Sequence, residues 1–489
     1  MSAMATAGTA VNSAAPARLD ALPWSRWHWR VVIALGITWL LDGLEVTLVG
    51  SLGAVLQRPE TLGLSAAAVG WAGAVYVAGA VIGALWFGRL ADKIGRKRLF
   101  LITLAVYVGA TVLTGLTFDL ASFLACRFVT GLGIGGEYAA INSAIDELIP
   151  ARVRGTVDLA INGSFWIGAA LGAGLSVVLL HPAWIGPELG WRAAFLLGAV
   201  LGVAILLVRR NLPESPRWLL AHGREQEAEA IVAAIEHEVA REHGPRPHPG
   251  RALRLRVRPL VSWGEILHVL VVRYRTRAVL GFSLMAAQAF FYNAIFFTYA
   301  LVLARYYGVP DDRVGLYIFP FALGNFLGPL VLGPYFDSKG RRVMIALTYA
   351  ASGIGLAASG YAFAHGWLDA TAQAACWAAI FFIASAAASS AYLTVSEIFP
   401  VEMRAVAISI FYAAGTGAGG IIGPALFGAL IESGSRTALY HGYLLAAALM
   451  CLAAVVAAVL GVDAERRPLE HVAPPLSAEA ETEKPESRP

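Results

Sequence analysis

The chain has 489 residues, of which 58% are apolar and only 14% are charged. Soluble proteins carry about 25% charged residues, so this composition excludes an ordinary soluble globular protein. The formal net charge of +4 is mild, and no nucleic-acid partner is expected.

Apolar residues gather in long blocks rather than on amphipathic stripes. A helix needs about 20 such residues to cross a hydrocarbon core of about 30 Å. The chain is therefore predicted to be an all-α membrane protein with twelve transmembrane helices in a lipid bilayer. In chain order these are 31–56, 67–90, 99–117, 120–144, 156–180, 192–208, 277–304, 313–336, 343–364, 371–395, 406–431 and 439–462.

The connections between these helices differ in charge. The second connection has four Lys or Arg residues at 93–98, and the eighth has three at 339–342. Arg152 and Arg154 lie in the fourth, whereas the alternate connections carry few basic residues. The positive-inside rule then predicts a multi-pass protein of the cytoplasmic membrane with both termini in the cytoplasm.

The sequence also repeats itself. Residues 88–97 (GRLADKIGRK) are matched by residues 333–342 (GPYFDSKGRR), 245 positions later. Residues 146–154 (DELIPARVR) are matched by residues 396–404 (SEIFPVEMR), 250 positions later. Two different motifs at nearly the same displacement indicate two six-helix halves in the same orientation.

The predicted organisation has five parts. They are a cytoplasmic N-terminal segment (1–29), an N-terminal six-helix half (30–208), a cytoplasmic linker (209–276), a C-terminal six-helix half (277–462) and a disordered cytoplasmic tail (463–489). Within the linker, residues 224–243 form a candidate amphipathic helix, which the Pro-rich segment 244–250 should end. The tail is rich in Pro and Glu, as is typical of disorder.

The loops at 88–97 and 333–342 resemble the signature of the major facilitator superfamily. Arg127 with residues 131–136 (GLGIGG), and residues 213–219 (PESPRWL), resemble the sugar-porter and metabolite–proton symporter families. The resemblance covers about 30–462 and implies the twelve-helix, two-half major facilitator fold. The glycine run also fits part of a dinucleotide-binding pattern, but no strand precedes it. We interpret it as close packing between helices 4 and 2.

Ionisable residues inside the predicted helices are candidates for proton coupling. Asp42 and Glu45 are three residues apart on one face of helix 1. Arg127 and Glu137 lie in helix 4. Charges at membrane depth are costly and normally pair or face a cavity. The resemblance implies that Asp42 pairs with Arg127 and exchanges a proton, with a permanent structural ion pair as the alternative. Glu45 and Glu137 could be second proton sites or ligands for a cationic substrate.

Polar and aromatic residues inside other helices are candidates for substrate binding. The resemblance implies that helix 7 presents Gln288 and Asn293, and helix 10 presents Tyr392. Gln288 and Asn293 are five positions apart, about 140° around a helix, so they share a wall only if the helix bends or unwinds. Ala287 and Thr416 depart from sugar-porter positions, which counts against a hexose. Residues 42–45 (DGLE) resemble the Asp-Gly-x-Asp element of aromatic-acid symporters, so an organic or aromatic acid fits at least as well as a sugar. The predicted substrate residues are Asn162, Trp166, Gln288, Tyr292, Asn293 and Tyr392.

Opposite charges recur at the predicted cytoplasmic ends of both halves. Such pairs could hold the halves together and would break when the cytoplasmic gate opens. The alternative is that they only set topology. The predicted gate residues are Asp92, Arg96, Glu147, Arg154, Asp337, Arg341, Glu397 and Arg404.

We therefore predict a secondary active transporter that carries a small polar metabolite by alternating access with proton symport. The metabolite would be an organic or aromatic acid or a sugar-like solute. Facilitated uniport and a transporter-like receptor or sensor are the alternatives. No enzymatic activity, cofactor or metal site is expected, and the chain is expected to be monomeric.

Overall fold

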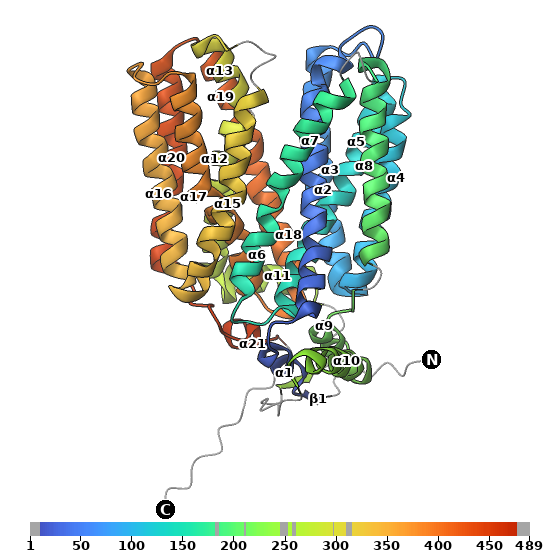
Figure 1. Cartoon of the computed structure of the whole chain (residues 1–489). Helices are drawn as coiled ribbons and strands as arrows, with labels where there is room; N and C mark the ends of the chain where they lie inside the picture. Colours follow the sequence, from blue (N-terminus) through green and yellow to red (C-terminus); the bar gives the residue numbers. More distant parts are fainter. Residues whose placement is uncertain are drawn as a thin grey trace, which may run out of the picture.

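The structure is a computed structural model. It describes residues 10–180, 185–209, 212–244, 253–256, 261–296, 298–309 and 315–476. Two bundles of long helices meet near one end and diverge toward the other (Figure 1).

Each half of the chain forms one bundle. The first consists of α2 (Arg26–Leu56), α3 (Ala66–Ile94), α4 (Arg96–Gly115), α5 (Leu120–Leu148), α6 (Arg154–Gly163) with α7 (Phe165–Leu180), and α8 (Pro187–Arg209). The second consists of α12 (Arg275–Phe296) with α13 (Tyr299–Tyr307), η2 (Gly315–Tyr317) with α15 (Ile318–Ser338), α16 (Arg341–Ala364), α17 (Ala370–Glu397), η3 (Val401–Met403) with α18 (Arg404–Gly415), η4 (Thr416–Gly420) and α19 (Ile421–Glu432), and α20 (Arg436–Leu460).

These helices confirm the predicted all-α, twelve-helix architecture. In the described part of the chain, ten helices are long and apolar enough to cross a membrane. The other two, α2 and α5, carry the ionisable residues Asp42, Glu45, Arg127 and Glu137.

Several helices begin at residues that satisfy their free backbone N–H groups. Ser65 accepts a hydrogen bond from the Ala68 amide at the start of α3. Asp119 accepts one from the Ser122 amide at the start of α5, and Asp369 accepts one from the Ala372 amide at the start of α17. A side-chain oxygen at this position replaces a missing intrahelical acceptor, so these polar residues mark where the apolar helices begin.

Glycines let α5 approach α3. A Cβ added at Gly131 would lie 2.0 Å from the Tyr76 carbonyl oxygen, and one added at Gly135 would lie 1.9 Å from that of Ala80. Only glycine permits such backbone contact. The glycine run is therefore a helix-packing surface, as predicted.

Smaller elements cover the end where the bundles meet (Figure 1). They are β1 (Ala10–Ser13), α1 (Ala15–Ala21), α9 (Pro216–Ala221), α10 (Glu225–His243), β2 (Leu253–Arg256), α11 (Trp263–His268), η1 (Val269–Arg273) and α21 (Leu469–Val472). Strands β1 and β2 pair antiparallel, with Ala10 opposite Arg256. Helix α10 confirms the predicted linker helix, and its predicted breaker lies mostly outside the described residues.

The predicted disorder of the tail does not begin at residue 463. Residues 463–476 are described, and α21 buries Leu469 and Val472. The Pro/Glu-rich composition did not reveal this short amphipathic turn. Residues 477–489 lie outside the described part.

Candidate functional site

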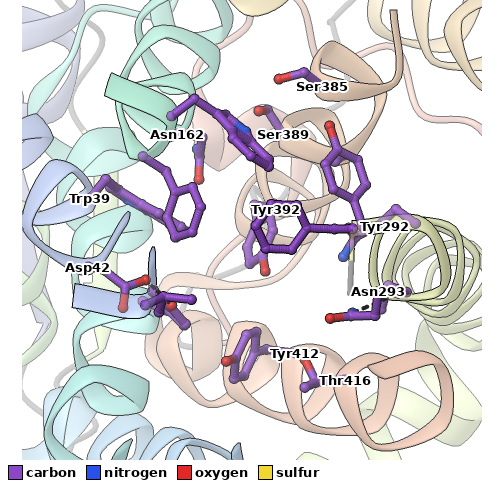
Figure 2. A pocket seen from close by; sticks show the side chains of 18 of the residues that line it. Trp39, Asp42, Asn162, Tyr292, Asn293, Ser385, Ser389, Tyr392, Tyr412 and Thr416 are labelled. Atoms are coloured by element: carbon purple, nitrogen blue, oxygen red, sulfur yellow. Dashed lines mark hydrogen bonds between the residues drawn. The ribbon is translucent and has the colours of Figure 1, made fainter. Parts of the chain in front are cut away.

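A cavity of about 240 Å³ lies between the two halves. The six predicted substrate residues all line it: Asn162, Trp166, Gln288, Tyr292, Asn293 and Tyr392. Asp42 also lines it, and Figure 2 shows Trp39, Asp42 and Asn162 facing Tyr292 and Asn293 across the space.

Aromatic rings form most of the cavity wall. Eight aromatic side chains line it: Trp39, Tyr138, Phe165, Trp166, Tyr292, Phe296, Tyr392 and Tyr412. The Trp39 ring stacks on Tyr138 with centroids 4.7 Å apart and meets Tyr392 edge-on at 5.9 Å. The Trp166 ring meets Phe296 of the other half at 5.4 Å. These rings make two broad apolar faces with hydroxyl groups at their edges.

Asp42 is the one ionisable acid or base among the described residues that line the cavity, apart from the tyrosine hydroxyls. Its side chain is 1% exposed. The Tyr76 hydroxyl donates a hydrogen bond to Asp42 Oδ1 over 3.0 Å, and the Tyr138 hydroxyl donates to Oδ2. Tyrosine hydroxyls can serve either a carboxylate or a protonated carboxyl group.

The predicted Asp42–Arg127 pair is wrong. Arg127 Nη1 lies 2.6 Å from Glu45 Oε1, and the guanidinium lies 4.4 Å above the Tyr76 ring. Asp42 and Glu45 share one side of α2, and the arginine on α5 contacts Glu45. The carboxyl group of Asp42 instead accepts hydrogen bonds from the hydroxyls of Tyr76 and Tyr138.

Glu45 and Arg127 form a buried ion pair behind the cavity. Both side chains are at most 4% exposed. Glu137 on α5 is also buried, and it does not line the cavity. Asp42 therefore differs from the other three candidates in facing the space that a solute would occupy.

Helix α12 presents both of its amides to the cavity without breaking between them. It runs unbroken from Arg275 to Phe296, so the bend or unwinding required between Gln288 and Asn293 is absent. The α12 residues that line the cavity, Gln288, Ala289, Tyr292, Asn293 and Phe296, instead form one broad face that spans about 140° around the helix. The Asn293 amide donates to the Ala289 carbonyl over 2.7 Å, which leaves its oxygen toward the cavity.

Sequence reasoning missed several cavity residues, chiefly Trp39, Tyr138 and Tyr412. Each is an aromatic residue within an apolar helix, where packing against a helix or lipid is equally common. The sequence held one indication of their role, which is that two of them lie close to intramembrane acids. Trp39 is three residues from Asp42, and Tyr138 follows Glu137.

The eight predicted gate residues meet where the bundles join, which we call the closed end. All eight are buried. Within the first half, Arg96 Nη2 lies 2.8 Å from Glu147 and 3.3 Å from Asp92. Within the second half, Arg341 lies 2.8 Å from Asp337 and 2.9 Å from Glu397. The sequence repeat is thus also a repeat of ion pairs.

Two aspartates connect the halves by capping helices of the opposite half. Asp337 accepts hydrogen bonds from the Gly155 and Thr156 amides at the start of α6, over 3.2 and 2.7 Å. Asp92 accepts one from the Val406 amide at the start of α18, over 3.2 Å. A carboxylate at a helix N-terminus is favoured by the free N–H groups and the helix dipole.

Two ion pairs also cross between the halves. Arg404 Nη1 lies 3.3 Å from Glu147 Oε1, and Arg154 Nη1 lies 3.7 Å from Glu397 Oε1. Glycine makes room at the first motif, because a Cβ added at Gly88 would lie 1.9 Å from Ser409 Oγ. The closed end is therefore joined by hydrogen bonds and ion pairs that separation of the halves at this end would break.

The linker and tail add an outer layer of charges. Arg217 of α9 lies 2.8 Å from Asp20 and 2.7 Å from Glu470 of α21. Burial acts to raise the pKa of Glu470, but the Arg217 guanidinium outweighs it and holds that pKa below its ordinary value. Glu470 is consequently ionised at neutral pH, and it ties the tail to the linker.

Weakening one helix cap is expected to open the closed end. Asp337→Asn removes a charged acceptor of two amides, and hydrogen bonds to charged groups contribute about 1.5–3 kcal/mol. The ratio of open to closed molecules should therefore rise about 10- to 150-fold. Spin-label distances between Lys93→Cys and Ser338→Cys, in a background without native cysteines, would measure it. Exposed Asp463→Asn is the control, and unchanged distances in Asp337→Asn would contradict a gating role.

Removing the Gln288 amide is expected to weaken solute binding. The side chain has no hydrogen-bond partner among the described residues, so a bound solute can satisfy it. Losing a hydrogen bond to an uncharged group costs about 0.5–1.5 kcal/mol, or about two- to tenfold in affinity. Calorimetric titration of Gln288→Ala would test this, with Gln57→Ala at the exposed end of α2 as the control. Equal affinity in both variants would remove Gln288 from the site.

Comparison with known proteins gives consistent matches. The family model described as "Sugar (and other) transporter" matches residues 12–474. The niacin transporter NiaP of Acinetobacter baylyi is 32% identical over 219 residues, 45% of this chain and 48% of NiaP. The chain thus spans about half the length of that relative.

Two further matches cover more of the chain. A gallate transporter of Pseudomonas putida is 26% identical over 431 residues, 85% of this chain and 88% of that protein. A structure of the proton:xylose symporter XylE has a TM-score of 0.75 at 20% identity and covers 91% of this chain and 98% of its own. At that identity, XylE shows the fold alone.

Proposed function

Since this chain belongs to the sugar (and other) transporter family of the major facilitator superfamily, we propose that it is a proton symporter for a small solute with one aromatic ring. It is a multi-pass membrane transporter of metabolites rather than an enzyme. The coupled ion and the solute class are the proposed parts.

One observation carries this proposal. Among the described residues, the cavity between the halves is lined by eight aromatic side chains and one carboxyl group, that of Asp42. Flat apolar walls suit a ring, which can stack or meet them edge-on. A carboxyl group facing the same space suits a proton, because no Lys, Arg or His among the described lining residues would offset the desolvation of the ionised form.

Coupling would follow from what surrounds Asp42 in each state. While the closed end is shut, Asp42 can take a proton from the side away from the closed end, and its two tyrosine partners accommodate both forms. When that end opens, water reaches the cavity from the other side and the proton can leave. The Glu45–Arg127 pair lies behind the cavity and would stay intact in both states.

Orientation is part of the proposal. The basic connections lie at the closed end, so the positive-inside rule supports a cytoplasmic location for it and for both termini. Contacts between halves at this end then correspond to an outward-facing protein. Inward opening would break the Asp92 and Asp337 caps described above.

The charge of the solute can be tested with a matched pair. Niacin carries a carboxylate where nicotinamide carries a neutral amide, and both have the same ring. No Lys, Arg or His is among the described cavity residues, so a carboxylate would bind beside Asp42 only while Asp42 is protonated. Nicotinamide needs no such proton.

A thermal-shift screen of the purified protein tests the ring site. Ligands that bind the folded state raise its apparent melting temperature. We expect shifts with niacin, nicotinamide or gallate, and we expect the niacin shift, if present, to fade as pH rises while that of nicotinamide persists. A shift with D-xylose alone would favour a sugar instead, which the amides of Asn162, Gln288 and Asn293 could also bind. Shifts with none of these compounds would contradict the proposal.

A further inference from the structure

Asp158 is a buried carboxyl group that neither the cavity nor the gate pairs account for. It lies on α6, and its side chain is 0% exposed. Asn162 Nδ2 donates to Asp158 Oδ2 over 3.2 Å, whereas Oδ1 has no hydrogen-bond partner among the described residues. Burying an ionised carboxylate without full pairing is far more costly than burying the neutral acid.

Helix α6 places Asp158 between the cavity and the closed end. Arg154, Asp158 and Asn162 are spaced four residues apart, so they share one face at a rise of about 6 Å per step. Arg154 belongs to the closed end, and Asn162 lines the cavity. The hydrogen bond between Asn162 and Asp158 therefore joins the solute site to the gate.

The sequence repeat identifies which charges at the closed end are extra. The matched set contains four carboxylates, Asp92, Glu147, Asp337 and Glu397, and four guanidinium groups, Arg96, Arg154, Arg341 and Arg404. These balance. Displacement by 250 positions relates Asp146 to Ser396 and Asp158 to Ile408, so the first half has two buried acids that the second half lacks. The second half has one of its own, Glu402, which corresponds to Arg152.

The described arginines nearest Asp146 and Asp158 are already paired with other carboxylates. Arg154 Nε lies 3.9 Å from Asp146, which is too far for a hydrogen bond. Arg154 also forms ion pairs with Glu397 and Asp20. The nearby Arg217 of the outer layer is already paired with Asp20 and Glu470. The buried layer as a whole thus holds more carboxyl groups than guanidinium groups.

The elements around α6 bring mainly negative charge toward Asp158. Asp337 of α15 caps the first turn of α6, and Asp146 of α5 and Glu397 of α17 lie 3.9 and 3.7 Å from Arg154 on that turn. Arg341 of α16 is paired with Asp337 and Glu397. Helix α7 has no ionisable residue, and the part of α2 beside α6 has none between Arg30 and Asp42. Since Arg154 and Arg341 are already engaged by these three acids, the surroundings of Asp158 favour a bound proton.

We propose that Asp158 is a proton-binding site of the closed end, which holds a proton while the halves are together and releases it when they separate. Opening moves Asp337 and Glu397 away with the second half and lets water reach Asp158. Ionisation then carries little cost, so proton release and opening favour each other. On the proposed orientation, cytoplasmic acidification stabilises the closed state.

The test uses purified protein in nanodiscs without any solute. Distances between spin labels at Lys93→Cys and Ser338→Cys report the open and closed populations at each pH. One linked proton changes their ratio up to about tenfold per pH unit. We expect the wild-type background to open progressively as pH rises. Asp158→Asn, which mimics the protonated acid and still accepts from Asn162, should stay closed throughout.

Controls separate this site from other acids. Exposed Asp463→Asn should keep the full pH response. Asp158→Ile, which copies Ile408 of the second half, should remain as closed as Asp158→Asn. If Asp158→Asn opens with pH as the wild type does, Asp158 is not the site. If the wild-type distances do not change with pH, the closed end binds no such proton.

The Asp158 proposal depends on the proposed function only for the orientation of the protein in the membrane and for its place in the transport cycle. Experiments can contradict the Asp158 site and the proton symport separately. A protein that shows the Asp158-dependent response but accumulates no solute in a proton gradient would contradict the symport and leave the site intact. Accumulation without that response would contradict the site alone.

Discussion

Replacing Asp42 with asparagine is expected to abolish proton-driven accumulation while exchange of solute across the membrane continues. The amide can keep a hydrogen bond from Tyr76 or Tyr138, so the cavity should retain its shape. It cannot release a proton, so solute movement is no longer linked to the gradient. Transport of labelled solute into proteoliposomes, measured with and without a pH step, separates accumulation from exchange.

Two further variants make the Asp42 result specific. Exposed Asp463→Asn should accumulate solute as the wild type does. Glu45→Gln should reduce stability more than coupling, because Glu45 is paired with Arg127 and does not line the cavity. Normal gradient-driven accumulation in Asp42→Asn would move the coupling role to another acid, with Glu45 and Glu137 as the next candidates.

Removing Arg127 is expected to destabilise the folded protein severely. Arg127→Ala leaves the Glu45 carboxylate buried without its partner, and breaking a buried pair in this way typically costs about 3–5 kcal/mol. Removing both charges together, as Glu45→Gln with Arg127→Gln, should recover much of that loss, since two amides can hydrogen-bond to each other. Thermal unfolding of the purified variants in detergent would measure both effects.

The control for this comparison is Arg98→Ala, which removes an exposed arginine at the start of α4. It should unfold at the wild-type temperature. An Arg127→Ala protein as stable as this control would show that the pair contributes little. A double variant no more stable than Arg127→Ala would show that lost packing, rather than an unpaired charge, causes the damage.

The architecture could be predicted because its signals are long and repeated. Twelve apolar blocks reflect the thickness of a bilayer, and two motif pairs at nearly constant displacement identify the halves. The residues of the closed end could be predicted from the same repeat, since an acid such as Asp337 recurs with its arginine in both halves. Sequence could not show that these residues are buried, or that Asp92 and Asp337 cap helices across the interface, because both depend on how the halves dock.

The interior of the site was less predictable. Two acids on one face of α2 were both possible partners for Arg127, and the sequence does not show which of them it contacts. In the structure Arg127 is paired with Glu45. The hydroxyls that hold Asp42 come from Tyr76 and Tyr138, which are two aromatic residues among many in apolar helices. Asp158 belongs to no recognised motif, and its burial with an oxygen that lacks a hydrogen-bond partner is visible only in the structure.

Proton coupling itself is tested most directly by solute accumulation in proteoliposomes under an imposed pH step, with the membrane potential clamped. The solute would be whichever of niacin, nicotinamide and gallate gives the largest thermal shift. One pH unit supplies about 1.4 kcal/mol per proton, so symport of one proton with a neutral solute should concentrate that solute about tenfold inside. Equal concentrations on both sides, reached at the same level with and without the pH step, would contradict symport and identify a uniporter.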